Sequence, residues 1–227
     1  MDEEIKTLEA QIESLHTAIE DLGNTFNPKL AKQLLEVYEE YEITVDGFCN
    51  ITVNNGVIDT NDDKFIQPEQ YIDLLVLYFI TDNWHNPAKF LWKRIPETMK
   101  RDKALKETWS IGKFLYTHKY QEAAGLIAQF TQGRLSNFLK AGYHHIMHAF
   151  LDQAYENIDD DTYRTFMGFS TEKEQKAFVK YYNEEVKPKV EAEKEENVEI
   201  SSDHLNTLKK LAQFIEKENK TQIEREA

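Results

Sequence analysis

Apolar residues recur at steps of three and four along most of this chain, the spacing of amphipathic α-helices. The first such stretch covers residues 2–22, where a narrow apolar face repeats over three heptads between Glu, Asp and Lys. Its apolar positions are Ile5, Leu8, Ile12, Leu15, Ile19 and Leu22. Asn27-Pro28 then has the residue types of an N-cap and a first helical turn, which predicts a second helix to about Tyr41.

A polar insert, Asp46–Asp63, interrupts the helical pattern. It contains Asn54-Asn55-Gly56, a sequence typical of a tight hairpin turn. Ile51-Thr52-Val53 and Val57-Ile58 would then be the two short strands. A plain surface loop explains the same composition, so both interpretations stay open.

The middle of the chain predicts a run of paired helices. Helix starts are indicated at Pro68, at Asn86-Pro87 and after Asp102, and further helices at residues 120–130 and 135–155. Trp109-Ser110-Ile111-Gly112 and the later Tyr120-Gln121-Glu122-Ala123-Ala124 come within one residue of the tetratricopeptide spacing. We therefore predict a helical-repeat arm of the tetratricopeptide type.

After residue 158 the elements become shorter. A helix over Asp159–Met167 ends at Gly168, and Thr171-x-x-Glu174 is a capping box that opens another helix to about Asn183. Two alternating strands, 189–191 and 198–200, complete the order of a winged helix. The predicted fold is mainly α, in four parts: N-terminal helices and insert (1–67), helical-repeat arm (68–157), winged helix with a small β-hairpin (158–200) and tail helix (201–227).

Composition and charge limit the classes of partner and the compartments that we expect for this chain. The chain has 227 residues and a net charge of −14, so most of its surface repels phosphate backbones and anionic lipids. Cys49 is the sole cysteine, which fits a reducing compartment. The acidic start and the short apolar runs, at most Leu74–Ile80, predict neither a signal peptide nor a membrane span. We expect a cytoplasmic and nuclear protein, with no membrane partner and nucleic acid disfavoured.

Motifs of catalysis are mostly missing. Neither a phosphate-binding loop nor a Gly-x-Ser-x-Gly elbow occurs, and nothing assigns a base to Cys49. His144, His148 and Asp152 would share one helix face and could hold zinc. However, His145 stands where a metalloprotease helix has its Glu, which favours structural or surface histidines. We expect no catalytic residue, no metal and no cofactor.

Two further groups could bind partners. Lys173, Lys176 and Lys180 form a basic stripe on the helix that reads DNA in winged-helix regulators, but acidic residues surround it. A solvated or partner-facing stripe is therefore favoured. Trp92 and Trp109, with Pro96, could line a peptide groove, although aromatic residues at this spacing more often belong to a core.

One string carries a family resemblance. Phe90-Leu91-Trp92-Lys93-Arg94-Ile95-Pro96, followed by Trp109-Ser110-Ile111-Gly112, resembles the subunit-eight family of the COP-nine signalosome. That family belongs to the PCI-domain group, which is shared with the proteasome lid and the eukaryotic initiation factor three complex. The resemblance implies a non-catalytic scaffold subunit of the complex that deneddylates cullin–RING ubiquitin ligases, where another subunit supplies the catalytic metal.

The resemblance also implies where partners bind, because winged helices of the family pack edge to edge and tail helices join a common bundle. The implied interface residues are Val190, Val198 and Ile200 at the wing, and Leu205, Leu208, Leu211 and Ile215 in the bundle. The implied partners are other signalosome subunits. The alternatives are a sister PCI subunit of the proteasome lid or of initiation factor three (its k subunit), a winged-helix nucleic-acid binder and a histidine-site metalloenzyme.

Overall fold

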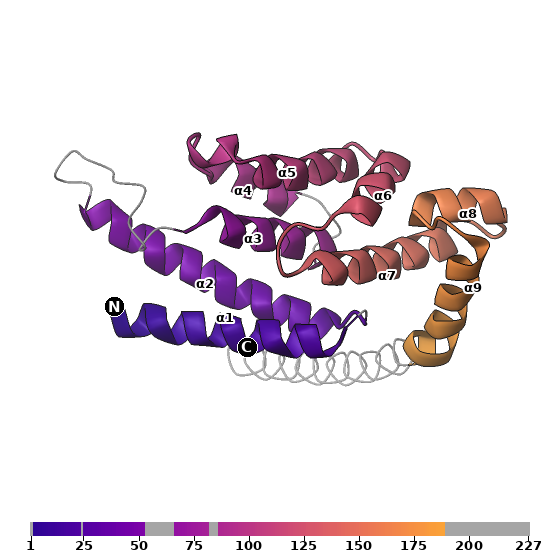
Figure 1. Ribbon diagram of the computed structural model, residues 1–227, viewed down its shortest axis with the longest axis horizontal. Coiled ribbons are helices and arrows are strands. Elements are labelled where there is room, and N and C mark those ends of the chain that lie inside the picture. Colours follow the sequence, from indigo (N-terminus) through magenta and orange to yellow (C-terminus); the bar gives the residue numbers. More distant parts are fainter. Residues whose placement is uncertain (1, 24, 53–65, 82–85, 189–227) are drawn as a thin grey trace, which may run out of the picture. The chain divides into compact units, whose positions relative to one another are not determined.

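The computed structural model describes residues 2–23, 25–52, 66–81 and 86–188, and within these ranges all regular structure is helical (Figure 1). The chain divides into two compact units, Met1–Thr171 and Glu172–Ala227. The prediction of a mainly α fold is confirmed. The predicted β-hairpin, tail helix and most of the polar insert lie outside the described residues, so the winged helix stays a prediction.

The first two helices form an antiparallel pair in the first unit. Helix α1 spans Asp2–Asp21 and α2 spans Pro28–Thr52, and the two pack along their length. The Asn27 side chain accepts hydrogen bonds from the backbone N–H groups of Lys29 and Leu30, at 3.0 and 3.3 Å, as the predicted cap requires. The apolar face of α1 is buried at Leu8, Ile12 and Ile19.

Helix α2 is longer than the sequence pattern predicted. It continues past Tyr41 to Thr52, so residues 46–52 of the expected insert are helical, and the strand expected at Ile51-Thr52 is wrong. The physical reason is that buried positions keep helical spacing through Tyr38, Tyr41 and Val45. This contact face explains the extension past Tyr41 as far as Val45, and the helix then continues through Gly47 to Thr52.

Helix α3, Pro68–Thr81, is the centre of the first unit. Every residue from Tyr71 to Ile80 is buried, because α2, α4, α5 and α7 all pack on it. In Figure 1 it lies between α2 and α5. A helix that is apolar all round is typical of such a position.

The remaining helices of the first unit follow the predicted boundaries closely. They are α4 (Asn86–Arg94), the 3₁₀ turn η2 (Met99–Arg101), α5 (Lys103–Tyr116), α6 (Tyr120–Gln129), α7 (Ser136–Ala154) and α8 (Asp160–Met167). Asp102 and Asp159 cap α5 and α8 through their side chains, and Gly168 closes α8 at a φ of 72°. Helix α8 packs on α6 and α7.

The described part of the second unit is short. Helix α9 spans Glu172–Tyr181 and continues as a π-helical turn, Tyr182–Val186, so the helical segment runs slightly past the predicted end near Asn183. Among the described residues, none of the helices combines the length and the apolar character that a bilayer crossing requires.

Candidate partner-binding surface

The first candidates are the interface residues that the family resemblance implies. They all lie outside the described residues: Val190, Val198, Ile200, Leu205, Leu208, Leu211 and Ile215. Their roles at a wing edge and in a helix bundle therefore stay predictions. The candidate surfaces below come from the described helices.

The histidines of α7 contact aromatic side chains. His148 Nδ1 lies 2.9 Å from the hydroxyl of Tyr163 on α8, and the His144 ring lies 4.7 Å from that of Phe169, centroid to centroid. His145 packs near Phe26, and burial lowers its pKa, with a smaller effect from His148. Within the described ranges no group of three potential ligands is arranged to hold a metal ion.

A buried polar cluster joins the first three helices. The Tyr38 hydroxyl on α2 donates to Asp73 Oδ2 on α3 at 3.1 Å and lies 2.9 Å from His16 Nε2 on α1. All three side chains are buried. Burial, and then the Asp73 carboxylate, raise the Tyr38 pKa, so the hydroxyl remains a proton donor. The cluster links the three helices through side-chain hydrogen bonds, and sequence reasoning missed it because the partners are far apart in the chain.

The two tryptophans weighed from the sequence meet between α4 and α5. Trp92 and Trp109 stack with ring centroids 5.0 Å apart and planes 6° from parallel. Both are half-buried, and Lys100 Nζ lies 5.5 Å from the Trp92 centroid. Gly112, three residues after Trp109, is buried where an added Cβ would lie 2.8 Å from the Phe79 ring of α3. The Trp–Gly spacing thus marks a close helix contact, and the stacked tryptophans remain partly exposed.

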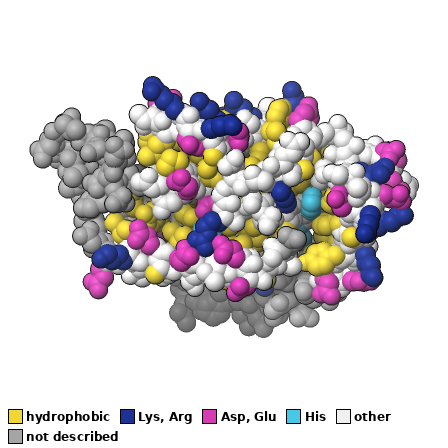
Figure 2. All heavy atoms as spheres, in the orientation of Figure 1, with side chains coloured by type: hydrophobic (Ala, Val, Ile, Leu, Met, Phe, Trp, Pro, Cys, Tyr) yellow, Lys and Arg dark blue, Asp and Glu magenta, His cyan; other side chains and the backbone are white. Residues whose placement is uncertain are grey.

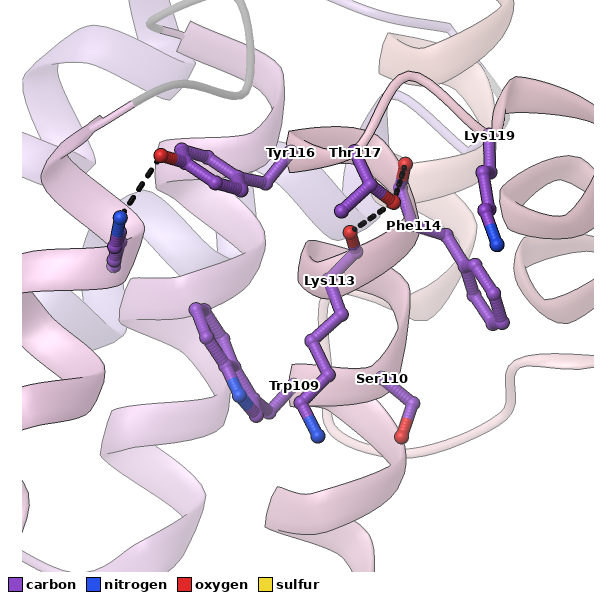
Figure 3. A pocket seen from close by; sticks show the side chains of 8 residues that line it. Trp109, Ser110, Lys113, Phe114, Tyr116, Thr117 and Lys119 are labelled. Carbon is purple, nitrogen blue, oxygen red and sulfur yellow. Dashed lines mark hydrogen bonds between the residues drawn. The ribbon is translucent and has the colours of Figure 1, made fainter.

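A depression of about 470 Å³ opens beside this stack. Figure 3 shows the side chains of α5 around it, with Trp109 at one side and Phe114 at the other. The lining residues are Lys89, Trp109, Ser110, Lys113, Phe114, Tyr116, Thr117 and Lys119. Its walls therefore combine aromatic rings with lysines.

Two of the lysines around the depression are available to a ligand. Lys113 and Lys119 are exposed, and neither has a carboxylate within ion-pair distance among the described residues. Lys89 instead donates to the Tyr116 hydroxyl at 2.8 Å and lies over that ring. This hydrogen bond lowers the pKa of Tyr116.

The depression belongs to a larger basic region. Residues 89–119 contain nine Lys or Arg against three Asp or Glu, a net charge of +6 in a chain whose net charge is −14. Figure 2 shows Lys and Arg gathered along the upper edge of the view, over α4 and α5. Arg94 is held by Glu42 of α2 at 2.6 Å, whereas Lys89, Lys93 and Lys100 lie over aromatic rings. We call this region the basic–aromatic surface; charge counted in windows would have revealed it, whereas the whole-chain total concealed it.

The lysine stripe predicted on the winged-helix segment is present on α9. Lys173, Lys176 and Lys180 are exposed, and Lys176 forms an ion pair with Glu172 one turn earlier. Carboxylates in the first turn of α9 therefore neutralise part of its charge. The α9 stripe is a weaker candidate for an anionic partner than the basic–aromatic surface.

Comparisons with known proteins agree on one family. The model of the CSN8/PSMD8/EIF3K family matches residues 66–198. A Danio rerio protein named COP9 signalosome complex subunit 8 is 26% identical over 119 residues, 50% of this chain and 62% of that protein. A Xenopus tropicalis protein of the same name is 25% identical over 161 residues, 67% of this chain and 73% of that protein. The chain thus spans less than two thirds of its zebrafish relative.

Proposed function

This chain belongs to the CSN8/PSMD8/EIF3K family, and from that membership we propose that it is a non-catalytic scaffold subunit of a COP9 signalosome. The names of the zebrafish and frog relatives support the signalosome over the proteasome lid and initiation factor three. The Leu91–Pro96 string on which the resemblance to the signalosome subunit rests lies within the segment that the family model matches. The family match is the observation that carries this proposal.

Its role would be to supply assembly surfaces to the complex that removes a ubiquitin-like modifier from cullin–RING ubiquitin ligases. The wing residues Val190, Val198 and Ile200 would lie at a strand edge, where unpaired backbone groups can form hydrogen bonds with a strand of a neighbouring subunit. The tail residues Leu205, Leu208, Leu211 and Ile215 would enter a helix bundle. An isolated helix of the length of Ser202–Lys217 is marginal in water, so its stability would come from partner helices.

Affinity purification tests the choice of complex. The tagged full chain, expressed in cells of its source and recovered at physiological salt, is expected to bring down signalosome subunits in equal amounts. Recovery of proteasome-lid or initiation-factor subunits instead would overturn the assignment. The same cells, imaged with the tag, test the cytoplasmic and nuclear localisation that is part of this proposal.

Two variants test the role of the tail. Substituting Leu208→Asp and Leu211→Asp together is expected to weaken co-purification while leaving the thermal melting of the free chain unchanged, since each adds a charge to the bundle. Ile43→Asp is the control for the substitution type, because it replaces one exposed apolar residue of α2 (72% exposed) with Asp, half the added charge of the tail variant. A tail variant that no longer melts cooperatively would show that the tail belongs to the core of its own unit.

The non-catalytic assignment has a separate test. The purified chain alone is expected to cleave no conjugate of a cullin with the ubiquitin-like modifier and to hold no zinc. Elemental analysis that finds about one tightly held zinc per chain, lost on substitution of His144 or His148, would favour the metalloenzyme alternative.

A further inference from the structure

We propose that the basic–aromatic surface on α4 and α5 binds an acidic peptide segment that carries one large apolar side chain. The carboxylates of the peptide contact the lysines, and its apolar side chain enters the depression beside Trp109. This inference depends on charge and shape alone and holds whichever complex the chain joins.

Charge complementarity selects an acidic ligand. Residues 89–119 carry a net charge of +6, and the rest of the chain carries −20. An acidic segment is therefore repelled by most of the molecule and attracted to this one region, which raises its rate of encounter there. Exposed Lys113 and Lys119 have no carboxylate partner among the described residues, so contact with a ligand breaks no ion pair seen in the structure.

The aromatic walls select an apolar side chain within that ligand. The depression of about 470 Å³ is in the size range of small-ligand pockets, and Trp109, Phe114 and Tyr116 contribute to its lining (Figure 3). Tyr116 is 40% exposed. Burial of these rings under a partner side chain removes apolar area from water, which stabilises a complex.

The length of the surface favours a peptide over nucleic acid. Helix α5 has 14 residues, which gives a length of about 21 Å. An extended peptide of roughly six residues spans that distance. A duplex carries one charge every ~1.7 Å and is stiff, so it extends beyond the basic–aromatic surface onto acidic faces. A short acidic peptide can place all of its charges on the lysines.

Fluorescence anisotropy measures the binding directly. The probe is a fluorescein-labelled peptide of sequence Asp-Glu-Asp-Phe-Glu-Asp-Glu, titrated with the full chain in 50 mM and 200 mM NaCl. We expect saturable binding that weakens at the higher salt. Replacing the Phe of the probe with Ser is expected to weaken binding several-fold, because the depression is then left unfilled.

Charge reversal locates the site. The double variant Lys113→Glu and Lys119→Glu is expected to weaken binding about tenfold or more, since both contacts become repulsive. Lys173→Glu and Lys180→Glu is the matched control, because it changes the net charge equally on the α9 stripe. This control is expected to change the Kd by less than about twofold, and circular dichroism checks that both variants remain helical.

Three outcomes would overturn the proposal. Loss of binding in the α9 variant but not in the α5 variant would place the site on α9. Tighter binding of a 12-base-pair duplex than of the peptide at 200 mM NaCl would identify a nucleic-acid surface. Dimerisation of the free chain that the Lys113→Glu and Lys119→Glu variant abolishes, seen by sedimentation velocity, would make a second copy the occupant.

Discussion

Substituting Gly142→Ala tests the close packing of α7 on α3. Gly142 is buried within α7, and an added Cβ would lie 2.8 Å from Ile80 Cγ2, 2.9 Å from Ile80 Cβ and 3.0 Å from the Phe26 ring. Ile80 Cβ is bonded directly to the α3 backbone, so rotation of the side chain cannot relieve the overlap. The two helices must therefore separate slightly.

The expected magnitude combines two opposing effects. Overpacking of a filled core costs roughly 1–3 kcal/mol, whereas replacing a helical glycine with alanine stabilises by about 0.5–1 kcal/mol. Gly142→Ala should therefore lower the free energy of unfolding by about 1–2 kcal/mol. Gly125→Ala is the control, because Gly125 is exposed on α6 and an added Cβ meets nothing within 4 Å. That variant should gain about 0.5–1 kcal/mol.

Urea unfolding followed by tryptophan fluorescence measures both variants. The probe reports on the first unit because all three tryptophans of the chain belong to it. The difference between the variants isolates the overpacking cost, about 1–3 kcal/mol. If Gly142→Ala stabilises as much as Gly125→Ala at an unchanged m value, then α3 and α7 are not in the close contact that the structure shows.

Three further predictions concern single side chains. Trp109→Ala should cost about 2 kcal/mol, less than the ~3–5 of a fully buried tryptophan, since Trp109 is half-buried against Trp92; an unchanged melting temperature by circular dichroism would contradict this. Burial lowers the pKa of His145 below its ordinary 6.5, so the unfolded chain takes up this proton at a higher pH than the folded chain and stability falls as pH drops from 7.5 to 5.5. In urea titrations at both pH values, His145→Gln should lose less stability between pH 7.5 and pH 5.5 than the unsubstituted chain loses. The Arg134 hydrogen bond lowers the pKa of Glu13 below 4.5. The stability that this hydrogen bond adds is therefore present above pH 4.5 and is lost as pH falls through the pKa of Glu13 in the folded chain. Arg134→Met should reduce the resulting fall in melting temperature at acid pH.

Helix starts could be predicted from the sequence because they depend on local chemistry. Asn27, Asp102 and Asp159 each cap the helix that their residue type indicated, through side-chain acceptors at the first turn. The end of α2 could not be predicted in this way. Buried positions continue past the predicted end near Tyr41 to Val45, and residue types alone do not show that the helix extends to Thr52.

The candidate site was harder to predict, because it is assembled from separate elements. Trp92 and Trp109 were recognised as a pair of interest, and the structure stacks them as part of the wall between α4 and α5. Lys113 and Lys119 were missed, because no motif marks them and only the structure shows that neither has a carboxylate within ion-pair distance among the described residues. The tail and wing residues, Val190 to Ile215, remain predictions from the family resemblance.

The two kinds of proposed interface should respond differently to salt. The helices of the first unit bury most of their large apolar side chains, and the large apolar residues left exposed among the described residues are Ile43, Phe90, Tyr116, Leu126, Phe150 and Tyr155. A partner of these helices is therefore attracted mainly by their charged side chains. Such attraction weakens as salt rises, because the Debye length becomes shorter. The tail stripe of leucines would associate through apolar burial, which sulfate or phosphate strengthens. A complex that keeps this subunit at high salt but loses the acidic partner would show that the chain holds its place by the tail and recruits through α4 and α5.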